Sequence, residues 1–142
     1  MNIAADRGQV TPKVEVQFDR PHRQHEPRDQ VAVRYRIEGC DGQRINAIEH
    51  SVLWYTEGKG EEDLGVHFFQ RITDRAMMPP ALSTGAFSTP LPQSPLSYEG
   101  RIVKVRWCVR VRLFFDGSRD FVSEHVFVLG RIPPALLSES RA

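Results

Sequence analysis

The pattern with the clearest chemical potential is a run of basic side chains at alternate positions in the last third of the chain. It consists of Lys104, Arg106, Arg110 and Arg112. In an extended strand all four point to one face, because successive side chains alternate between the two faces. Such a basic face can bind an acidic protein tail, a phosphorylated segment or a lipid head group. Arg34 and Arg36 have the same spacing, and we add them to this candidate partner-binding site.

The same residues have a second interpretation, in which the cations are paired across strands with carboxylates. Candidate ion-pair partners are Glu38, Glu49 and Glu124, which lie in other segments with strand character. Exposed cross-strand ion pairs are common and contribute little to stability. The two interpretations differ in what the neighbouring strands present, because acidic residues opposite the stripe would occupy its cations.

The remaining reactive residue types form no catalytic or metal-binding motif. The five histidines are spread over the chain as His22, His25, His50, His67 and His125, whereas a metal site needs three or four converging ligands. The acidic segment 57–63 lacks the alternating ligands of an EF-hand loop. Neither a nucleophile elbow nor a phosphate-binding loop is present. The sequence therefore predicts no enzyme, no metal and no cofactor.

The two cysteines and a tryptophan invite comparison with the buried disulfide of antibody domains. Cys108, however, shares its strand position with the basic residues, while the adjacent Trp107 falls on the apolar face. Cys40 lies in a segment that is typical of a turn. A buried inter-sheet disulfide needs both sulfur atoms between the sheets, so we expect free thiols. Trp54 and Trp107 both lie within apolar alternation and are predicted core residues.

Composition and charge describe one ordinary globular domain. Its 142 residues are 40% hydrophobic and 26% charged, and 19 basic residues against 18 acidic ones give a net charge of +1. A balanced charge argues against a nucleic-acid partner. No apolar run reaches the roughly 18 residues that span a bilayer, and the N-terminus lacks a signal-peptide pattern. We expect a cytoplasmic protein with reduced thiols and no transmembrane segment.

Apolar and polar residues alternate with a period of two through most of the chain, which predicts strands. The clearest is 101–115, where every odd position from Val103 to Phe115 is apolar. A helix would bury several of its charges, whereas a strand keeps them all on one face. Further strands are predicted at 13–19, 30–38, 45–56, 64–73, 86–91 and 120–129.

These strands predict an all-β fold. About seven strands separated by frequent turn signals are typical of an antiparallel β-sandwich. Near Val52–Tyr55 both faces are apolar, which predicts a central position in a sheet. We expect a polar leader at 1–12, one sandwich domain at 13–130 and a C-terminal tail at 131–142.

Two segments resemble the arrestin superfamily, in particular its small bacterial relatives. Residues 91–107 combine a Pro-rich stretch, a Ser-Tyr-x-Gly turn and a strand of alternating apolar and basic residues. Residues 52–60 are similar to a mid-domain strand and loop of that superfamily. The resemblance implies an immunoglobulin-like sandwich. Arrestins carry two sandwiches and this length allows one, so their receptor-binding and phosphate-sensing apparatus is not carried over.

Together these features predict a non-enzymatic protein-interaction module, an adaptor or scaffold. A partner protein with an acidic segment would dock through an edge strand or through the basic strand face. The alternative is a small-ligand or carbohydrate-binding β-sandwich, which would need an open face with exposed aromatic rings such as Tyr55 or Phe69. The sequence leaves self-association open. We expect Tyr98 and Gly100 to serve the turn before the long strand.

Overall fold

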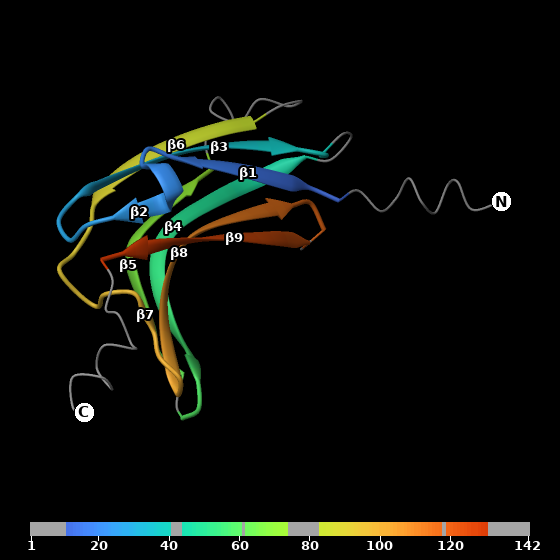
Figure 1. Cartoon of the computed structure of the whole chain (residues 1–142). Helices are drawn as coiled ribbons and strands as arrows, with labels where there is room; N and C mark the ends of the chain where they lie inside the picture. The colour runs from blue at the N-terminus through green and yellow to red at the C-terminus, as the bar shows by residue number, and fades with distance from the viewer. Residues whose placement is uncertain (1–10, 41–43, 61, 74–82, 118, 131–142) are drawn as a thin grey trace, which may run out of the picture.

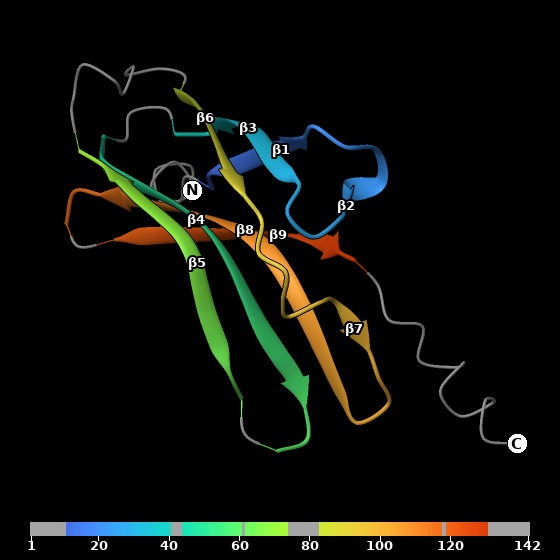
Figure 2. The ribbon, with the colours of Figure 1, turned by 90° about the vertical axis from the view of Figure 1, so that its left-hand side faces the viewer.

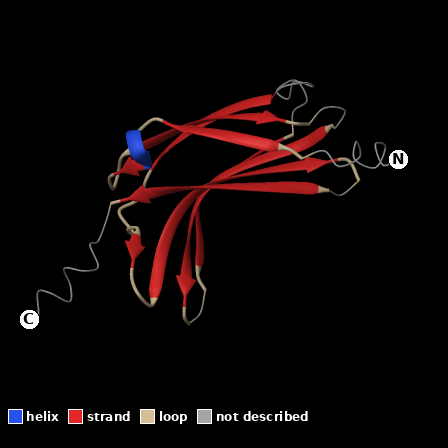
Figure 3. Cartoon of the chain, turned by 45° about the vertical axis from the view of Figure 1, so that its right-hand side comes forward, coloured by secondary structure: helices blue, strands red, loops and turns tan. Residues whose placement is uncertain are grey.

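The computed structural model describes residues 11–40, 44–60, 62–73, 83–117 and 119–130. The predicted C-terminal tail lies outside the described residues, as does all of the predicted leader except residues 11 and 12. In the described ranges the chain consists of strands and loops with one short helical turn, η1 (Pro21–Arg23), which Figure 3 shows at the end of β1. None of the described helices has the length and apolarity needed to cross a membrane.

Two sheets pack face to face (Figure 1). The small sheet has the strand order β1-β3-β6, with β1 (Lys13–Phe18), β3 (Gln30–Glu38) and β6 (Ser83–Pro90). The large sheet has the order β2-β9-β8-β4-β5, with β7 paired to β8. Its strands are β2 (Gln24–His25), β4 (Ile45–Gly58), β5 (Leu64–Ile72), β7 (Tyr98–Glu99), β8 (Val103–Phe115) and β9 (Asp120–Leu129). All pairs are antiparallel except β2 with β9, so the predicted all-β sandwich is confirmed.

All seven predicted strands are present, with shifts of up to three residues at their ends. The long strand begins at Val103 rather than at residue 101, and β6 begins at Ser83 rather than at residue 86. β2 and β7 were not predicted, because two residues are too few to show alternation.

The core lies between the inner faces of the two sheets. Side chains from β3 and β8 form much of it, namely Val31, Val33, Tyr35, Ile37, Trp107, Val109, Val111 and Leu113. Strand β4 is central between β5 and β8, and its Val52 and Leu53 are 0% and 1% exposed although they point to opposite faces. The predicted central position of this segment is therefore confirmed.

A chain of polar side chains crosses the core from the small sheet to the edge of the large one. The Tyr35 hydroxyl lies 2.9 Å from Nδ1 of His50, and Nε2 of His50 lies 2.7 Å from Oε1 of Gln70. Because an amide oxygen only accepts, His50 donates from Nε2 and its Nδ1 accepts from the hydroxyl. Burial lowers the pKa of His50 and raises the pKa of Tyr35 to about 12, so both groups are neutral at pH 7.

A β-bulge interrupts the pairing of β4 with β5. Val52 pairs with Phe68 and Leu53 pairs with Val66, so His67 is the additional residue on β5. Nε2 of His67 donates a hydrogen bond to the carbonyl of Pro90 at 2.6 Å. On the two sides of the bulge, the outward-pointing and inward-pointing positions of β5 are therefore out of phase.

The segment between β6 and β7 joins the two sheets at one end of the sandwich (Figure 2). The indole Nε1 of Trp107 donates to the Pro95 carbonyl at 2.7 Å. Ser97 exchanges two hydrogen bonds with Leu129, one through its backbone N–H and one through its hydroxyl. The N–H of Gly100 then donates to the Val103 carbonyl at 3.0 Å and closes the turn before β8, where Tyr98 and Gly100 were expected.

Candidate functional site

The four basic residues of β8 lie on the outer face of the large sheet. Residues on the other face of the strand, such as Trp107 and Val109, are fully buried, whereas Lys104, Arg106, Arg110 and Arg112 are partly exposed. The predicted alternation is therefore confirmed from Trp107 to Phe115, apart from Cys108, which is buried on the outer face.

Each of these four cations lies close to a carboxylate of a neighbouring strand. Their partners are Glu99 for Lys104 (3.8 Å), Glu57 (2.6 Å) and Glu99 (3.1 Å) for Arg106, Glu124 for Arg110 (2.6 Å) and Asp120 for Arg112 (2.6 Å). The hydrogen bond to Glu57 raises the pKa of Arg106. This is the geometry of the ion-pair interpretation. Docking of a partner on these residues stays a prediction.

Arg34 and Arg36 do not join the β8 stripe, and the structure corrects this expectation. Both lie on β3, which belongs to the small sheet, so they occupy the opposite outer face of the sandwich. Arg36 is paired with Glu15 at 3.2 Å and Glu38 at 2.8 Å. Alternation defines the face of a strand but not the sheet that the strand joins, so the sequence could not separate the two groups.

Arg34 lines two hollows on the outer surface of the small sheet. Two adjoining hollows of about 500 and 650 Å³ share Gln17, Arg34 and Ala86 as lining residues. Nη2 of Arg34 donates to Oε1 of Gln17 at 3.4 Å. The hollows exist because the outward side chains of β6 are small.

The outer face of the large sheet also carries exposed apolar side chains, which were not predicted from the sequence. Six large apolar side chains of the described residues are exposed, and five of them share this face. These are Leu64, Val66 and Phe69 on β5 and Val122 and Val126 on β9. The available signal was the loss of alternation at Phe68-Phe69 and Phe121-Val122, where both faces of a strand are apolar.

One apolar row crosses four strands of this face. Val66, Leu53, Cys108 and Val126 are register neighbours on β5, β4, β8 and β9. Leu53 and Cys108 are 1% and 0% exposed, while Val66 and Val126 at the ends of the row are 55% and 38% exposed. The outer face therefore has a buried apolar centre and exposed apolar ends.

The cysteines are unsuited to nucleophilic chemistry. Cys40 and Cys108 are both buried, and neither forms a disulfide. Burial raises the pKa of the Cys108 thiol to about 12, with a smaller contribution from Glu124. A thiol with such a pKa is protonated at pH 7, and the thiolate is the reactive form.

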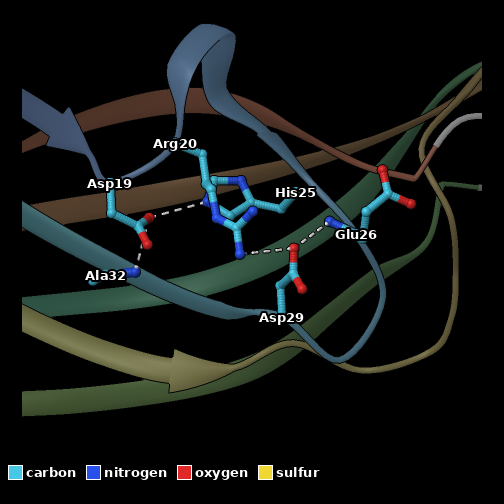
Figure 4. A network of polar contacts seen from close by, with 6 residues as sticks. All are labelled: Asp19, Arg20, His25, Glu26, Asp29 and Ala32. Carbon is cyan, nitrogen blue, oxygen red and sulfur yellow. Dashed lines mark hydrogen bonds and ion pairs between the residues drawn. The ribbon is translucent and has the colours of Figure 1, made fainter.

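The histidines serve local structure. His25 is fully buried, and its Nε2 lies 3.2 Å from Oδ1 of Asp19, which also accepts from the backbone N–H of Ala32 (Figure 4). Desolvation of Asp19 opposes ionisation, but the hydrogen bonds from His25 and Ala32 outweigh it and lower the pKa of Asp19. Among the described residues, no three His, Cys, Asp or Glu side chains converge as a metal site would require.

A Ser–His contact on β9 is the nearest approach to a catalytic pair. The hydroxyl of Ser123 lies 2.6 Å from Nε2 of His125. Burial and the nearby Arg23 lower the pKa of His125. In the described part of the chain no carboxylate is hydrogen-bonded to His125, so the third member that orients the base of a catalytic triad is missing there.

Strand β5 is the least protected edge of the sandwich. It is the last strand of the large sheet and pairs with β4 alone among the described strands. Its nine residues contain no Pro, Lys, Asp or Glu, and their one arginine, Arg71, is paired with Glu49 of the neighbouring strand. The edges of the small sheet differ, because β1 carries Lys13 and Glu15 and β6 ends in Pro90. Charges and proline are the usual means of blocking an edge against pairing.

The two packed sheets define an immunoglobulin-like sandwich of arrestin type, as the resemblance of the sequence implied. The structure is similar to the crystal structure of Spo0M, a sporulation control protein from Bacillus subtilis, with a TM-score of 0.58 and 16% sequence identity. The similarity covers 85% of this chain and 49% of Spo0M, so this chain spans about half the length of that protein. No family model matches the sequence, and no curated protein matches it. The likeness confirms the fold.

Proposed function

We propose that this chain is a non-enzymatic interaction module, an adaptor or scaffold, that binds a partner protein along the edge strand β5. The observation that carries the proposal is that the least protected edge also carries three exposed apolar side chains, Leu64, Val66 and Phe69. An extended segment added to a sheet edge gains main-chain hydrogen bonds, and alternate side-chain contacts provide specificity.

The neighbouring residues support binding on this side of the sheet. Leu64, Val66 and Phe69 form an exposed apolar surface at the edge, and Val66 is backed by the buried Leu53 and Cys108 of the apolar row. Exposed apolar surface of this kind is a common feature of protein-interaction sites. The β8 cations lie two strands from the edge on the same face. In this proposal they form a charged rim that an acidic partner segment would contact.

The two buried cysteines, which form no disulfide, are compatible with a reducing compartment, and we place the module in the cytoplasm. The protonated Cys108 thiol and the incomplete Ser–His pair support a role without catalysis.

Site-specific photo-crosslinking in the native host tests this function. A photo-reactive amino acid at Phe69 is expected to form adducts with a partner protein, and the same group at Gln17 on the small sheet is the matched control. A Val66→Lys substitution should abolish the Phe69 adducts, because it places a charge beside the edge. Equal adducts at both positions, or adducts that persist with Val66→Lys, would contradict docking on β5.

The basic rim is tested separately with Arg106→Glu and Arg110→Glu in the same crosslinking experiment. If the rim contacts an acidic segment, the yield of adducts falls while the position of crosslinking on the partner is unchanged. An unchanged yield assigns these arginines to their ion pairs with Glu57 and Glu124 alone.

Carbohydrate or small-ligand binding is the second candidate, because Phe69 is 53% exposed and Tyr55 is partly exposed on the same face. Two adjoining hollows lie instead on the small sheet. Binding to a glycan array that is lost with Phe69→Ala would favour this candidate over the interaction module.

A further inference from the structure

We propose that β5 pairs with β5 of a second copy of this chain, antiparallel and across a two-fold axis, and joins two large sheets into one. This inference rests on the proposed function, which assigns the edge but not the occupant. It follows from the order of outward and inward side chains along β5, which the bulge makes symmetric.

The register with β4 shows which side chains of β5 share a face. Leu64, Val66, Phe69 and Arg71 are opposite Tyr55, Leu53, Ser51 and Glu49, all on the outer face. Gly65, Phe68 and Gln70 are opposite Trp54, Val52 and His50, which point inward. His67 is exposed at the sheet edge, but its ring lies edge-on to the buried Trp107 with centroids 6.1 Å apart, so it also points to the inner side. From residue 64 to residue 71 the order is out, in, out, in, in, out, in, out. This order reads the same in both directions.

A strand with a palindromic order of faces can pair with itself. In an antiparallel pair, residues directly opposite each other point to the same side of the sheet. A two-fold axis between His67 and Phe68 places Val66 opposite Phe69 of the second copy, and all outward residues opposite outward residues. A regular strand without the bulge would mismatch its faces in this register.

The contacts made by this pairing are favourable for the exposed side chains. Val66 and Phe69 are 55% and 53% exposed in one copy, and the axis brings both copies of each into one apolar cluster. Apolar cross-strand pairs of this kind are a main source of stability between strands. The pairing also satisfies the free backbone groups of a nine-residue edge.

Charge presents no obstacle to a second copy. Arg71 is the one formally charged side chain of β5 besides the histidine, and it is paired with Glu49 of its own chain. The axis places Arg71 opposite Leu64 of the second copy, so the two arginines are about 23 Å apart along the strands at 3.3 Å per residue. Like charges opposite each other, which destabilise a strand pair, are therefore avoided.

Sedimentation equilibrium of the full chain tests self-association. We expect a dimer whose dissociation constant rises at least tenfold with Val66→Lys or Phe69→Lys, because each change places two lysines in the apolar cluster. Gln17→Lys on the small sheet is the matched control and should leave the dimer unchanged. Circular dichroism checks that each variant is folded. We expect that it is, because Val66 and Phe69 are exposed in the single chain.

Disulfide formation tests the register. Opposite positions in the proposed pair are Val66 and Phe69, so a mixture of the Val66→Cys and Phe69→Cys variants should form a cross-linked dimer on mild oxidation. Either variant alone should cross-link poorly, because its two copies are about 10 Å apart along the strands. The unsubstituted chain, whose two thiols are buried, controls for Cys40 and Cys108.

The outcomes separate this inference from the function on which it rests. The chain could stay monomeric at millimolar concentration while the crosslinks from Phe69 to another protein persist. That result would overturn the pairing with a second copy but would keep the edge strand as a docking site. If Val66→Lys and Phe69→Lys leave a dimer intact, both the inferred pairing and the β5 edge as the dimer surface are overturned. A monomer without crosslinks removes the proposed function as well.

Discussion

At the scale of single residues, the polar chain from Tyr35 through His50 to Gln70 matters most, because each of its hydrogen-bonding atoms meets one specific partner. The hydroxyl of Tyr35 and the two ring nitrogens of His50 form a chain that ends on Gln70. Because these groups come from both sheets, the chain selects one relative position of the sheets. An apolar core alone would tolerate several positions.

Replacing Tyr35 by Phe removes the hydroxyl and leaves the buried Nδ1 of His50 without its donor. We expect a loss of about 1–2 kcal/mol in the free energy of unfolding, since an unsatisfied buried acceptor costs its desolvation. Urea unfolding measures the change. Tyr55→Phe is the matched control, and its effect should stay within about 0.5 kcal/mol because Tyr55 lies on the outer surface. Equal losses in the two variants would contradict the role of the polar chain.

The histidines also predict how stability depends on pH. Burial lowers the folded-state pKa of His50 and of His125 below the usual value of 6.5. Below pH 6.5 the unfolded chain therefore binds more protons at these two histidines than the folded chain does. Their contribution to the free energy of unfolding is fully present above pH 6.5 and is lost as the pH falls through the folded-state pKa values.

Urea unfolding between pH 7 and pH 5 should therefore show falling stability. His125→Gln should reduce this slope. A slope of the opposite sign, or one that His125→Gln does not alter, would count against this assignment.

At the scale of strands, the contact between β4 and β5 depends on the absence of a side chain. A Cβ atom at Gly65 would lie 2.3 Å from Nε1 of Trp54, so the indole covers the glycine. Gly65→Ala should displace Trp54 and destabilise the fold by about 1–3 kcal/mol, as overpacking does elsewhere. Tryptophan fluorescence and urea unfolding report both effects. Val66 follows Gly65 in the sequence and is exposed, so Val66→Ala is the control and should change the free energy of unfolding by less than about 0.5 kcal/mol.

Strands with strong alternation could be predicted from the sequence. Features that depend on which strands pair with each other could not. Residues 103–115 show their strand and its two faces directly, because charge burial excludes a helix. The sheet to which Arg34 belongs is set by long-range pairing with β1 and β6, and alternation carries no information about it. The basic residues of the candidate site were therefore predicted as individual surface residues but not as separate groups.

The apolar edge was missed for a related reason. Phe68 and Phe69 are adjacent apolar residues, and without the position of the bulge either one can be assigned to the core. The ion pairs of the β8 cations were among the alternatives that the sequence left open, but three of the four carboxylate partners in the structure differ from the candidates named there. Only Glu124 was among those candidates.

At the scale of the whole molecule, we expect the two sheets to unfold as one cooperative unit. The three strands of the small sheet bury their inner face only against the large sheet, and β3 and β8 share the same core. Fluorescence of Trp54 and Trp107 reports the large sheet, while far-UV circular dichroism reports both sheets. We expect the two unfolding curves to coincide in urea. An earlier transition by circular dichroism would show that the small sheet melts separately.

The burial of both thiols gives the folded protein a built-in reporter of its own opening. Cys108 is fully buried and Cys40 is 6% exposed, so an alkylating reagent can modify them only when the sandwich opens by local or global unfolding. The rate of alkylation in native buffer then reads the population of open molecules without denaturant. Because Cys108 is next to Leu53 in the row that ends at Val66, its labelling also monitors how firmly the strands beside the edge are held.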